Sequence, residues 1–183
     1  MATGDDDQVT HLAIRAGHGD RAALSQFIQA TQRDVWRMVA YLATPANADD
    51  LTQETFLRAM RSLPRFSGRS TARTWLFSIA RRVVVDQIRY ETSRPRTTHV
   101  ASLEDVVNQR GHQSRTENVV EIRLLLDGLE PQRREALVLT QVLGLSYAEA
   151  ADVCGCPVGT IRSRVARARD DLIEAARADH RAG

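Results

Sequence analysis

The residues with the clearest chemistry are arginines and small hydroxyl residues close to the C-terminal end of the chain. They fall on one side of a segment with helical periodicity and comprise Thr160, Arg162, Ser163, Arg164 and Arg167. Guanidinium and hydroxyl groups on such a face can bond to base edges and phosphates in the major groove of DNA. We expect the first three to meet base edges and the two remaining arginines to hold phosphates. The alternative is a basic helix of a bundle whose arginines are only solvated.

A helix-turn-helix would position these side chains. Ser146 is a suitable N-cap for a supporting helix, Gly155 permits a tight turn, and Pro157 suits the first turn of the second helix. The second helix would bury a stripe at three- and four-residue spacing, made of Ile161, Val165, Ala168 and Leu172. The N-terminal end of that helix would lie closest to the bases.

A second basic face belongs to a long helix expected over about residues 71–90. Its apolar residues cover most of the circumference and leave a polar stripe of Thr74, Ser78, Arg81, Arg82 and Arg89. A strand of nucleic acid could follow this stripe, although an ordinary solvated face explains it equally well. The preceding loop, residues 66–70, could bind an extruded base by stacking on Phe66. Trp75 lies on the apolar arc, and we expect it in the core.

An acidic segment opens the helix expected between the turn at residues 44–50 and Pro64. Asp50 followed by Gln53 resembles a capping box. Acids in a first helical turn are common because the helix dipole favours them, so alone they indicate no function. Only their context suggests a protein-docking face.

Composition and charge narrow the class of protein. The 183 residues have a net charge of +2, and all 25 basic residues are arginine. Residues 64–99 carry eight arginines against two acids, whereas residues 100–130 carry six acids against three arginines. This alternation fits a nucleic-acid partner better than a membrane surface. The acidic N-terminus is no signal peptide, no apolar run approaches a membrane span, and we expect a cytoplasmic protein.

Signals for catalysis and cofactors are missing from the sequence. Cys154 and Cys156 have no second pair of ligands at metal-site spacing, so we expect small turn residues and no metal site. No phosphate-binding loop, dinucleotide fingerprint or nucleophile motif is recognisable. We expect neither an enzyme nor a bound cofactor.

The periodicities predict an all-α protein with two small helical domains joined by a flexible linker. Gly17 and Gly19 would separate a short first helix from a longer second one. The expected segments are a disordered tail at 1–8, a first domain at 9–91, the linker at 92–116, a second domain at 117–177 and a tail at 178–183.

Two long strings carry a resemblance to a known family. GLSYAEAADVCGCPVGTIRSRVARAR resembles region four of the extracytoplasmic-function (ECF) sigma factors of the sigma-70 superfamily, and DDLTQETFLRAMRSLPRFSGRSTARTWLFSIARRVVVDQIR resembles region two. Within the family, the sequence looks like the mycobacterial sigma factor C subgroup. Two positions depart from the pattern: Arg82 stands where many members have asparagine, and Ala150 replaces a larger aliphatic residue.

The resemblance implies a promoter-specificity subunit that recruits core RNA polymerase and assists promoter melting. By position, it implies docking on the β′ clamp helices through Asp49, Asp50, Leu51, Gln53, Glu54 and Phe56. It implies capture of the −10 element by Phe66, Ser67, Arg69, Ser70, Arg73, Ser78, Arg81, Arg82 and Arg89. Region four would read the −35 element and meet the β flap, and an anti-sigma factor is a further expected partner.

Two other classes of protein remain as alternatives. A stand-alone helix-turn-helix regulator would explain residues 144–172 but would leave the long basic helix unused. An enzyme acting on nucleic acid would need a carboxylate or metal cluster, which the sequence does not offer.

Overall fold

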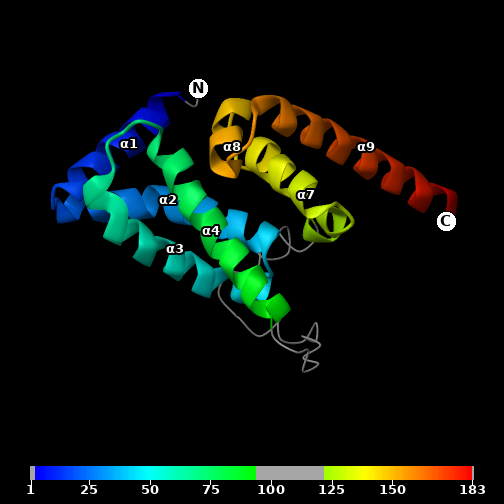
Figure 1. Ribbon diagram of the computed structural model, residues 1–183, viewed down its shortest axis with the longest axis horizontal. Helices are drawn as coiled ribbons and strands as arrows, with labels where there is room; N and C mark the ends of the chain where they lie inside the picture. The colour runs from blue at the N-terminus through cyan, green and yellow to red at the C-terminus, as the bar shows by residue number, and fades with distance from the viewer. Residues whose placement is uncertain (1–2, 94–121, 183) are drawn as a thin grey trace. The chain divides into compact units, whose positions relative to one another are not determined.

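The computed structural model describes residues 3–93 and 122–182, and every regular element in these ranges is helical. The chain divides into two units, Met1–Thr98 and His99–Gly183 (Figure 1). The predicted all-α fold with two helical domains is therefore confirmed. The expected linker lies outside the described residues, except for its first two positions, which end a helix.

Over residues 3–93, the first unit consists of four helices and two 3-10 turns. The helices are α1 (Thr3–Gly17), α2 (Arg21–Leu42), α3 (Ala48–Ser62) and α4 (Ala72–Ser93), and the turns are η1 (Pro45–Asn47) and η2 (Leu63–Arg65). They enclose an apolar core whose largest fully buried side chains are Tyr41, Phe27, Phe77, Met38 and Leu76. Burial of these side chains is the main force that holds α4 and the loop before it in place.

The break between α1 and α2 falls where the two glycines predict it. Asp20 is the N-cap of α2, and its carboxylate accepts a bond of 3.0 Å from the amide of Ala23. That amide, together with the guanidinium of Arg15, lowers the pKa of Asp20.

The beginning of the chain differs from the prediction, because α1 starts at Thr3 and residues 3–8 are helical. The expectation of a disordered tail over residues 1–8 is therefore wrong from Thr3 onward. Two interactions stabilise this first part of α1. The helix dipole interacts favourably with acids at the N-terminus, and Asp6 forms an ion pair with Arg73 on α4. The sequence offers no local sign of this long-range partner.

The start of α3 also differs from the prediction. The capping box expected from Asp50 and Gln53 is absent, because both residues lie inside a helix that begins at Ala48. The 3-10 turn η1 leads the chain into that helix instead. In the first turn of α3, the carboxylate of Asp49 accepts a bond of 2.8 Å from the indole N–H of Trp36 on α2.

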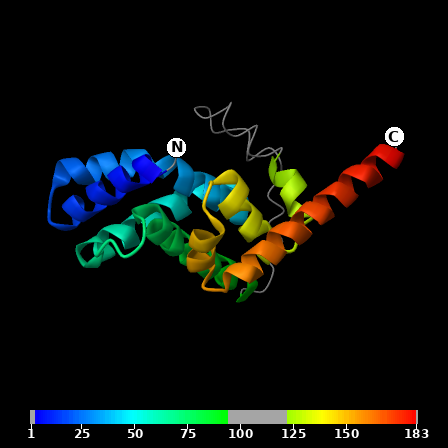
Figure 2. The same cartoon turned by 90° about the horizontal axis from the view of Figure 1, so that it is seen from above.

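The second unit begins, within the described residues, with a helical stretch at 122–127. It continues with α7 (Pro131–Leu137), the π-helical turn η3 (Val138–Val142), α8 (Tyr147–Cys154) and α9 (Val158–Ala182). Figure 2 shows α9 as one continuous helix, so the segment expected as a tail at 178–183 is helical as far as Ala182. The alanine-rich sequence after Leu172 has the propensity to extend the helix.

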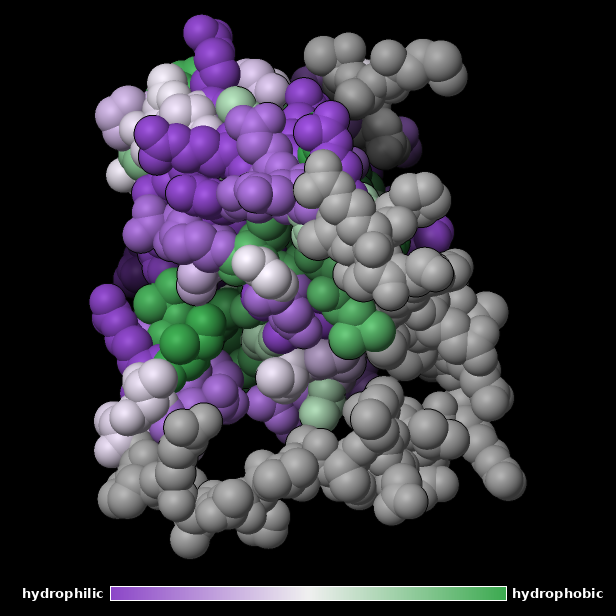
Figure 3. Space-filling model, turned by 90° about the vertical axis from the view of Figure 1, so that its right-hand side faces the viewer, coloured by the Kyte–Doolittle hydropathy of each residue, from purple (hydrophilic) through white to green (hydrophobic). Residues whose placement is uncertain are grey.

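The surface carries some exposed apolar side chains. Figure 3 shows hydrophobic residues gathered within a mostly hydrophilic face. Among the described residues, large exposed side chains include Leu57 and Met60 on α3 and Leu124 and Leu125 in the second unit. No helix in residues 3–93 or 122–182 has the length and apolar character of a membrane span.

Candidate nucleic-acid interfaces

The helix-turn-helix has the caps that the sequence predicts. The hydroxyl of Ser146 accepts a bond of 3.2 Å from the amide of Glu149, whose carboxylate accepts one of 2.9 Å from the amide of Ser146. This reciprocal pair is a capping box that fixes the start of α8. Gly155 ends α8 with a φ of 64°, a left-handed conformation that favours glycine. Pro157 lies one residue before α9 rather than in its first turn, and its carbonyl accepts from the amide of Thr160 at 2.9 Å.

The buried stripe of α9 is confirmed for three of its four members. Ile161, Val165 and Ala168 are almost completely buried, whereas Leu172 is half-buried. An ion pair of 2.6 Å between Arg133 on α7 and Asp171 on α9 fixes the rotation of the helix further along. Its hydrogen bond raises the pKa of the Arg133 guanidinium. The opposite face of α9 is consequently turned outward.

The predicted DNA-reading residues of α9 divide into two groups. Arg162, Ser163 and Arg167 are exposed, and within residues 3–93 and 122–182 neither arginine forms an ion pair. Thr160 is half-buried, and its carbonyl accepts a bond of 3.0 Å from the Ser163 hydroxyl. These side chains lie in the first three turns of the helix, which is where a recognition helix approaches bases.

Arg164 belongs to the second group, because its guanidinium is used inside the protein. It is half-buried, donates one hydrogen bond to the side-chain oxygen of Gln132 on α7, and lies 3.7 Å from the sulfur of Cys156. This arginine ties α9 to the turn and to α7. The expectation that it holds a phosphate finds no support in its contacts.

The outward face of α4 is narrower than the predicted stripe. Arg82 and Arg89 are exposed, and Ser78 and Arg81 are half-buried. Thr74 is only 3% exposed, so its place in the polar stripe was predicted wrongly. Its hydroxyl lies 2.8 Å from that of Thr71, the residue just before the helix. The exposed arginines of α4 therefore lie from its middle onward, in residues 82–93, which form the basic half of the helix.

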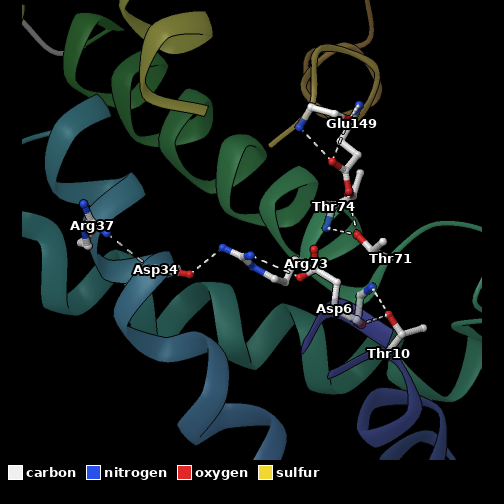
Figure 4. A network of polar contacts seen from close by, with 10 residues as sticks. Asp6, Thr10, Asp34, Arg37, Thr71, Arg73, Thr74 and Glu149 are labelled. Carbon is white, nitrogen blue, oxygen red and sulfur yellow. Dashed lines mark hydrogen bonds and ion pairs between the residues drawn. The ribbon is translucent and has the colours of Figure 1, made fainter. Parts of the chain in front are cut away.

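Arg73 is held by two carboxylates of its own unit. Its guanidinium nitrogens lie 3.2 Å from Asp6 on α1 and 2.7 Å from Asp34 on α2 (Figure 4). The guanidinium carbon is also 5.6 Å from the ring centre of Phe77. These contacts make Arg73 a junction between three helices, and DNA would have to compete with them for this side chain.

The loop before α4 presents its polar side chains to solvent. Ser67 and Arg69 are exposed, Ser70 is half-buried, and the ring of Phe66 packs on that of Trp75 with centres 4.8 Å apart. Trp75 is half-buried, so its placement in the core is only partly right. The Trp75 ring supports the loop by packing against the ring of Phe66, and helical periodicity does not predict this contact.

The predicted docking residues of α3 include both exposed and buried side chains. Asp49, Asp50 and Gln53 are exposed, whereas Leu51 and Phe56 are buried in the core and thus cannot form a docking surface without rearrangement. Two exposed apolar residues on the side of Gln53 were missed, Leu57 at 46% and Met60 at 39%. The signal in the sequence was their position outside the buried stripe of the helix.

Glu54, the remaining docking candidate, is linked to α4. Its carboxylate lies 2.7 Å from Arg58, which also lies 2.6 Å from Asp86 on α4. The bond to Asp86, and then that to Glu54, raises the pKa of the Arg58 guanidinium. Asp86 is an acid within the basic half of α4, and this ion pair offsets its charge.

The two cysteines show no metal-site geometry. Cys154 and Cys156 are half-buried and form no disulfide. In the part of the chain that the structure describes, no group of three or more His, Cys, Asp or Glu side chains could hold a metal ion.

Comparisons with known proteins now identify the family. The family models for Sigma-70 region 2 and for Sigma-70, region 4 match residues 27–94 and 120–172. A probable RNA polymerase sigma-C factor of Mycobacterium bovis is 58% identical over 179 residues, which cover 98% of this chain and 97% of the relative. The chain belongs to the ECF sigma factors of the sigma-70 family. The ECF RNA polymerase sigma-E factor of Salmonella typhimurium is a more distant relative, 33% identical over 177 residues and covering 91% and 92% of the two chains.

Solved structures resemble this sigma factor in fold as well. CnrH in complex with the cytosolic domain of CnrY matches with a TM-score of 0.73 and 26% identity, covering 94% of this chain and 99% of that one. The sigma factor RpoE of Bartonella quintana, in complex with the anti-sigma factor NepR, has a TM-score of 0.66 and 27% identity over 85% and 98% of the two chains. The resemblance to the sigma factor C subgroup is likewise confirmed. Region 2 as matched begins inside α2, so α1 lies ahead of it.

Proposed function

We propose that this ECF sigma factor binds core RNA polymerase through the exposed face of α3 and contacts a promoter at two elements. Promoter recognition in transcription initiation is the function of the family to which the chain belongs. The −35 element would be read by α9. The −10 element would be captured by the loop at residues 66–70 and by the basic half of α4.

The exposed face of α9 is the main support for the proposed −35 contact. Arg162 and Arg167 are exposed, lack ion-pair partners among the described residues, and lie outside the buried stripe of the helix. An arginine in this setting is available for bidentate contact with a guanine edge or for a phosphate. Thr160 and Ser163 are small enough to let the helix backbone approach the bases.

The proposed −10 contact uses the loop and the helix together. The exposed side chains of Ser67 and Arg69 offer hydrogen bonds to an extruded base, and Phe66 offers a ring for stacking. Arg82 and Arg89 continue as positive charges along α4 for the strand that follows. We do not include Arg73 in this set, because its two ion pairs compete with DNA.

Promoter melting would then be driven by binding energy. Each base step that opens costs about 1.4 kcal/mol of stacking, and a stacked base in a protein pocket returns about 1–3 kcal/mol. Capture of a few bases of the displaced strand is therefore of the right size to assist melting. We assign no catalytic residue to this chain.

The proposed polymerase contact is the face of α3 made of Asp49, Asp50, Gln53, Leu57 and Met60. Polar rims around exposed apolar residues are typical of protein-binding surfaces. An anti-sigma factor is a second proposed partner. RpoE is seen in complex with the anti-sigma factor NepR, and CnrH in complex with the cytosolic domain of CnrY. Such a protein would act in the cytoplasm, where polymerase and DNA are found.

Assembly with core polymerase tests the docking part of the proposal. Leu57→Asp, which puts a charge in the centre of the face, should weaken core binding at least tenfold, measured by fluorescence anisotropy of a labelled sigma factor. Arg61→Ala on the same helix is a control for changes in surface charge. Unchanged core affinity of Leu57→Asp would show that another surface docks on polymerase.

A further inference from the structure

One face of α1 follows the loop that is proposed to capture the −10 base. Four residues of α1, spaced by three or four positions, contact successive points on the segment from η2 to the start of α4. The pairs are Asp6 with Arg73, Thr10 with Ala72, Ile14 with Gly68, and Gly17 with Leu63. As the number increases along α1 it decreases along the loop, so the two segments run antiparallel, as their ribbons in Figure 1 show. This spacing places all four contacts on one side of the helix.

Thr10 caps α4 from another helix. Its hydroxyl accepts a bond of 2.9 Å from the amide of Ala72, the first residue of α4, and donates one of 2.7 Å to the carbonyl of Asp6 (Figure 4). Ala72 is completely buried, so water cannot replace this acceptor. The third amide of the helix, that of Thr74, is satisfied by the local N-cap Thr71 at 3.2 Å. The start of α4 therefore depends on both a local cap and a distant one.

The middle of the loop rests on Ile14. Gly68 has a φ of 70°, and a Cβ atom at this position would lie 3.2 Å from the Cδ1 atom of Ile14. At the other end, a Cβ on Gly17 would lie 2.6 Å from the carbonyl oxygen of Leu63. The close approach to a backbone oxygen requires glycine at position 17, whereas at position 68 the positive φ favours glycine. The path of the loop is thus fixed against α1 at its beginning and at its middle.

From this register we infer that α1 positions the base-capturing loop, with Thr10 as the main positioning residue and Ile14 as the second. The inference rests on the proposed role of residues 66–70 at the −10 element. It adds a function to a helix that precedes the segment matched by Sigma-70 region 2. The side chains of α1 need not touch DNA for this role, because they act through the loop and the first turn of α4.

The test uses the full-length chain assembled with purified core polymerase. Three variants are compared: Thr10→Val, which removes the hydroxyl at constant size; Thr10→Ser, which restores it; and Thr31→Val as a matched control. Thr31 is a buried threonine on α2 whose hydroxyl donates to the carbonyl of Phe27 within the same helix. Three affinities are measured for each holoenzyme: for core polymerase, for a single-stranded DNA selected from a random pool with the wild type, and for a duplex selected in the same way.

Thr10→Val should weaken binding of the single-stranded DNA about tenfold, because a buried amide at the start of α4 loses its partner. Its affinities for core polymerase and for the duplex should stay within about twofold of the wild type. Thr10→Ser and Thr31→Val should retain all three affinities. Ile14→Ala should repeat the selective loss if Thr10→Val does not fold.

Two results would overturn the inference. One is a wild-type affinity of Thr10→Val for the single strand; the other is an equal loss of all three affinities, which would reveal a general role in folding. A wild-type holoenzyme that binds no single-stranded DNA would instead refute the proposed function of the loop, and the inference with it.

Discussion

Three arginines of α9 that the sequence all assigns to DNA, Arg162, Arg164 and Arg167, should respond differently to alanine. Arg162 is exposed and close to the start of the helix, so Arg162→Ala leaves the fold intact and removes a base contact. A bidentate arginine–guanine contact is worth about 1–3 kcal/mol of discrimination. We therefore expect the preferred −35 duplex to lose about 5- to 150-fold in affinity, with relaxed specificity at one base pair.

Arg167 is exposed two turns from the start of α9, where a phosphate contact is the expected role. Arg167→Ala should weaken binding to all duplexes equally and reduce the slope of log K against log salt by about 0.9. Arg164→Ala serves as the contrasting variant, because its guanidinium bonds to Gln132 inside the unit. It should lower the free energy of unfolding by about 1 kcal/mol, with little change in specificity.

The assay is a salt titration of holoenzyme binding to a selected duplex and to its single-base variants, alongside thermal melting of each free protein. A changed base preference for Arg164→Ala, with none for Arg162→Ala, would contradict this division of roles. Lower thermal stability of Arg162→Ala would also contradict it, because that result would place the Arg162 guanidinium in an internal contact.

Other predictions concern stability and follow from single contacts. Ser146→Ala removes the capping box of α8 and should lower the free energy of unfolding of the second unit by about 1 kcal/mol. Chemical denaturation, followed through a signal that reports on the second unit, would measure this change. Gly17→Ala places a Cβ 2.6 Å from a backbone carbonyl and should cost about 1–3 kcal/mol, whereas Gly4→Ala, with open space around it, should not destabilise. The pKa of Asp20 is lowered in the folded state, first by the amide of Ala23, so the stability it contributes is complete above its ordinary pKa and is lost as the pH falls through the lower folded value. Melting temperatures of Asp20→Asn and the wild type should therefore differ at neutral pH and converge in acid; a constant difference would contradict the assignment.

Local patterns predicted the parts of the fold that depend on local interactions. The caps of α8, the break after Gly17 and the buried stripe of α9 all follow from residue type and spacing over a few positions. The exposed faces of α4 and α9 were predicted less well, because exposure depends on what packs against a helix. Thr74 is buried although it belongs to the polar stripe by spacing, and the guanidinium of Arg164 bonds to Gln132, a residue 32 positions away.

The N-terminal helix shows the same limit most clearly. Residues 3–8 are acidic and polar, so nothing in their own sequence indicates packing. They are ordered by contacts with a segment more than 60 residues away, from Asp6 to Arg73 and from Thr10 to Ala72. The family resemblance did not indicate this helix, because the sequence string that carries it for region two begins at Asp49, after α1.

Promoter-dependent transcription in a purified system shows directly whether this chain directs core polymerase to promoters. Purified core polymerase and this chain are combined on a library of genomic templates, and run-off transcripts are mapped. We expect transcripts that start downstream of a shared pair of −35 and −10 sequences, that require the chain, and that fall sharply with Arg162→Ala. Transcripts that are independent of the chain, or tight binding of the chain to the same duplexes without polymerase and no stimulation of transcription, would contradict the proposed function.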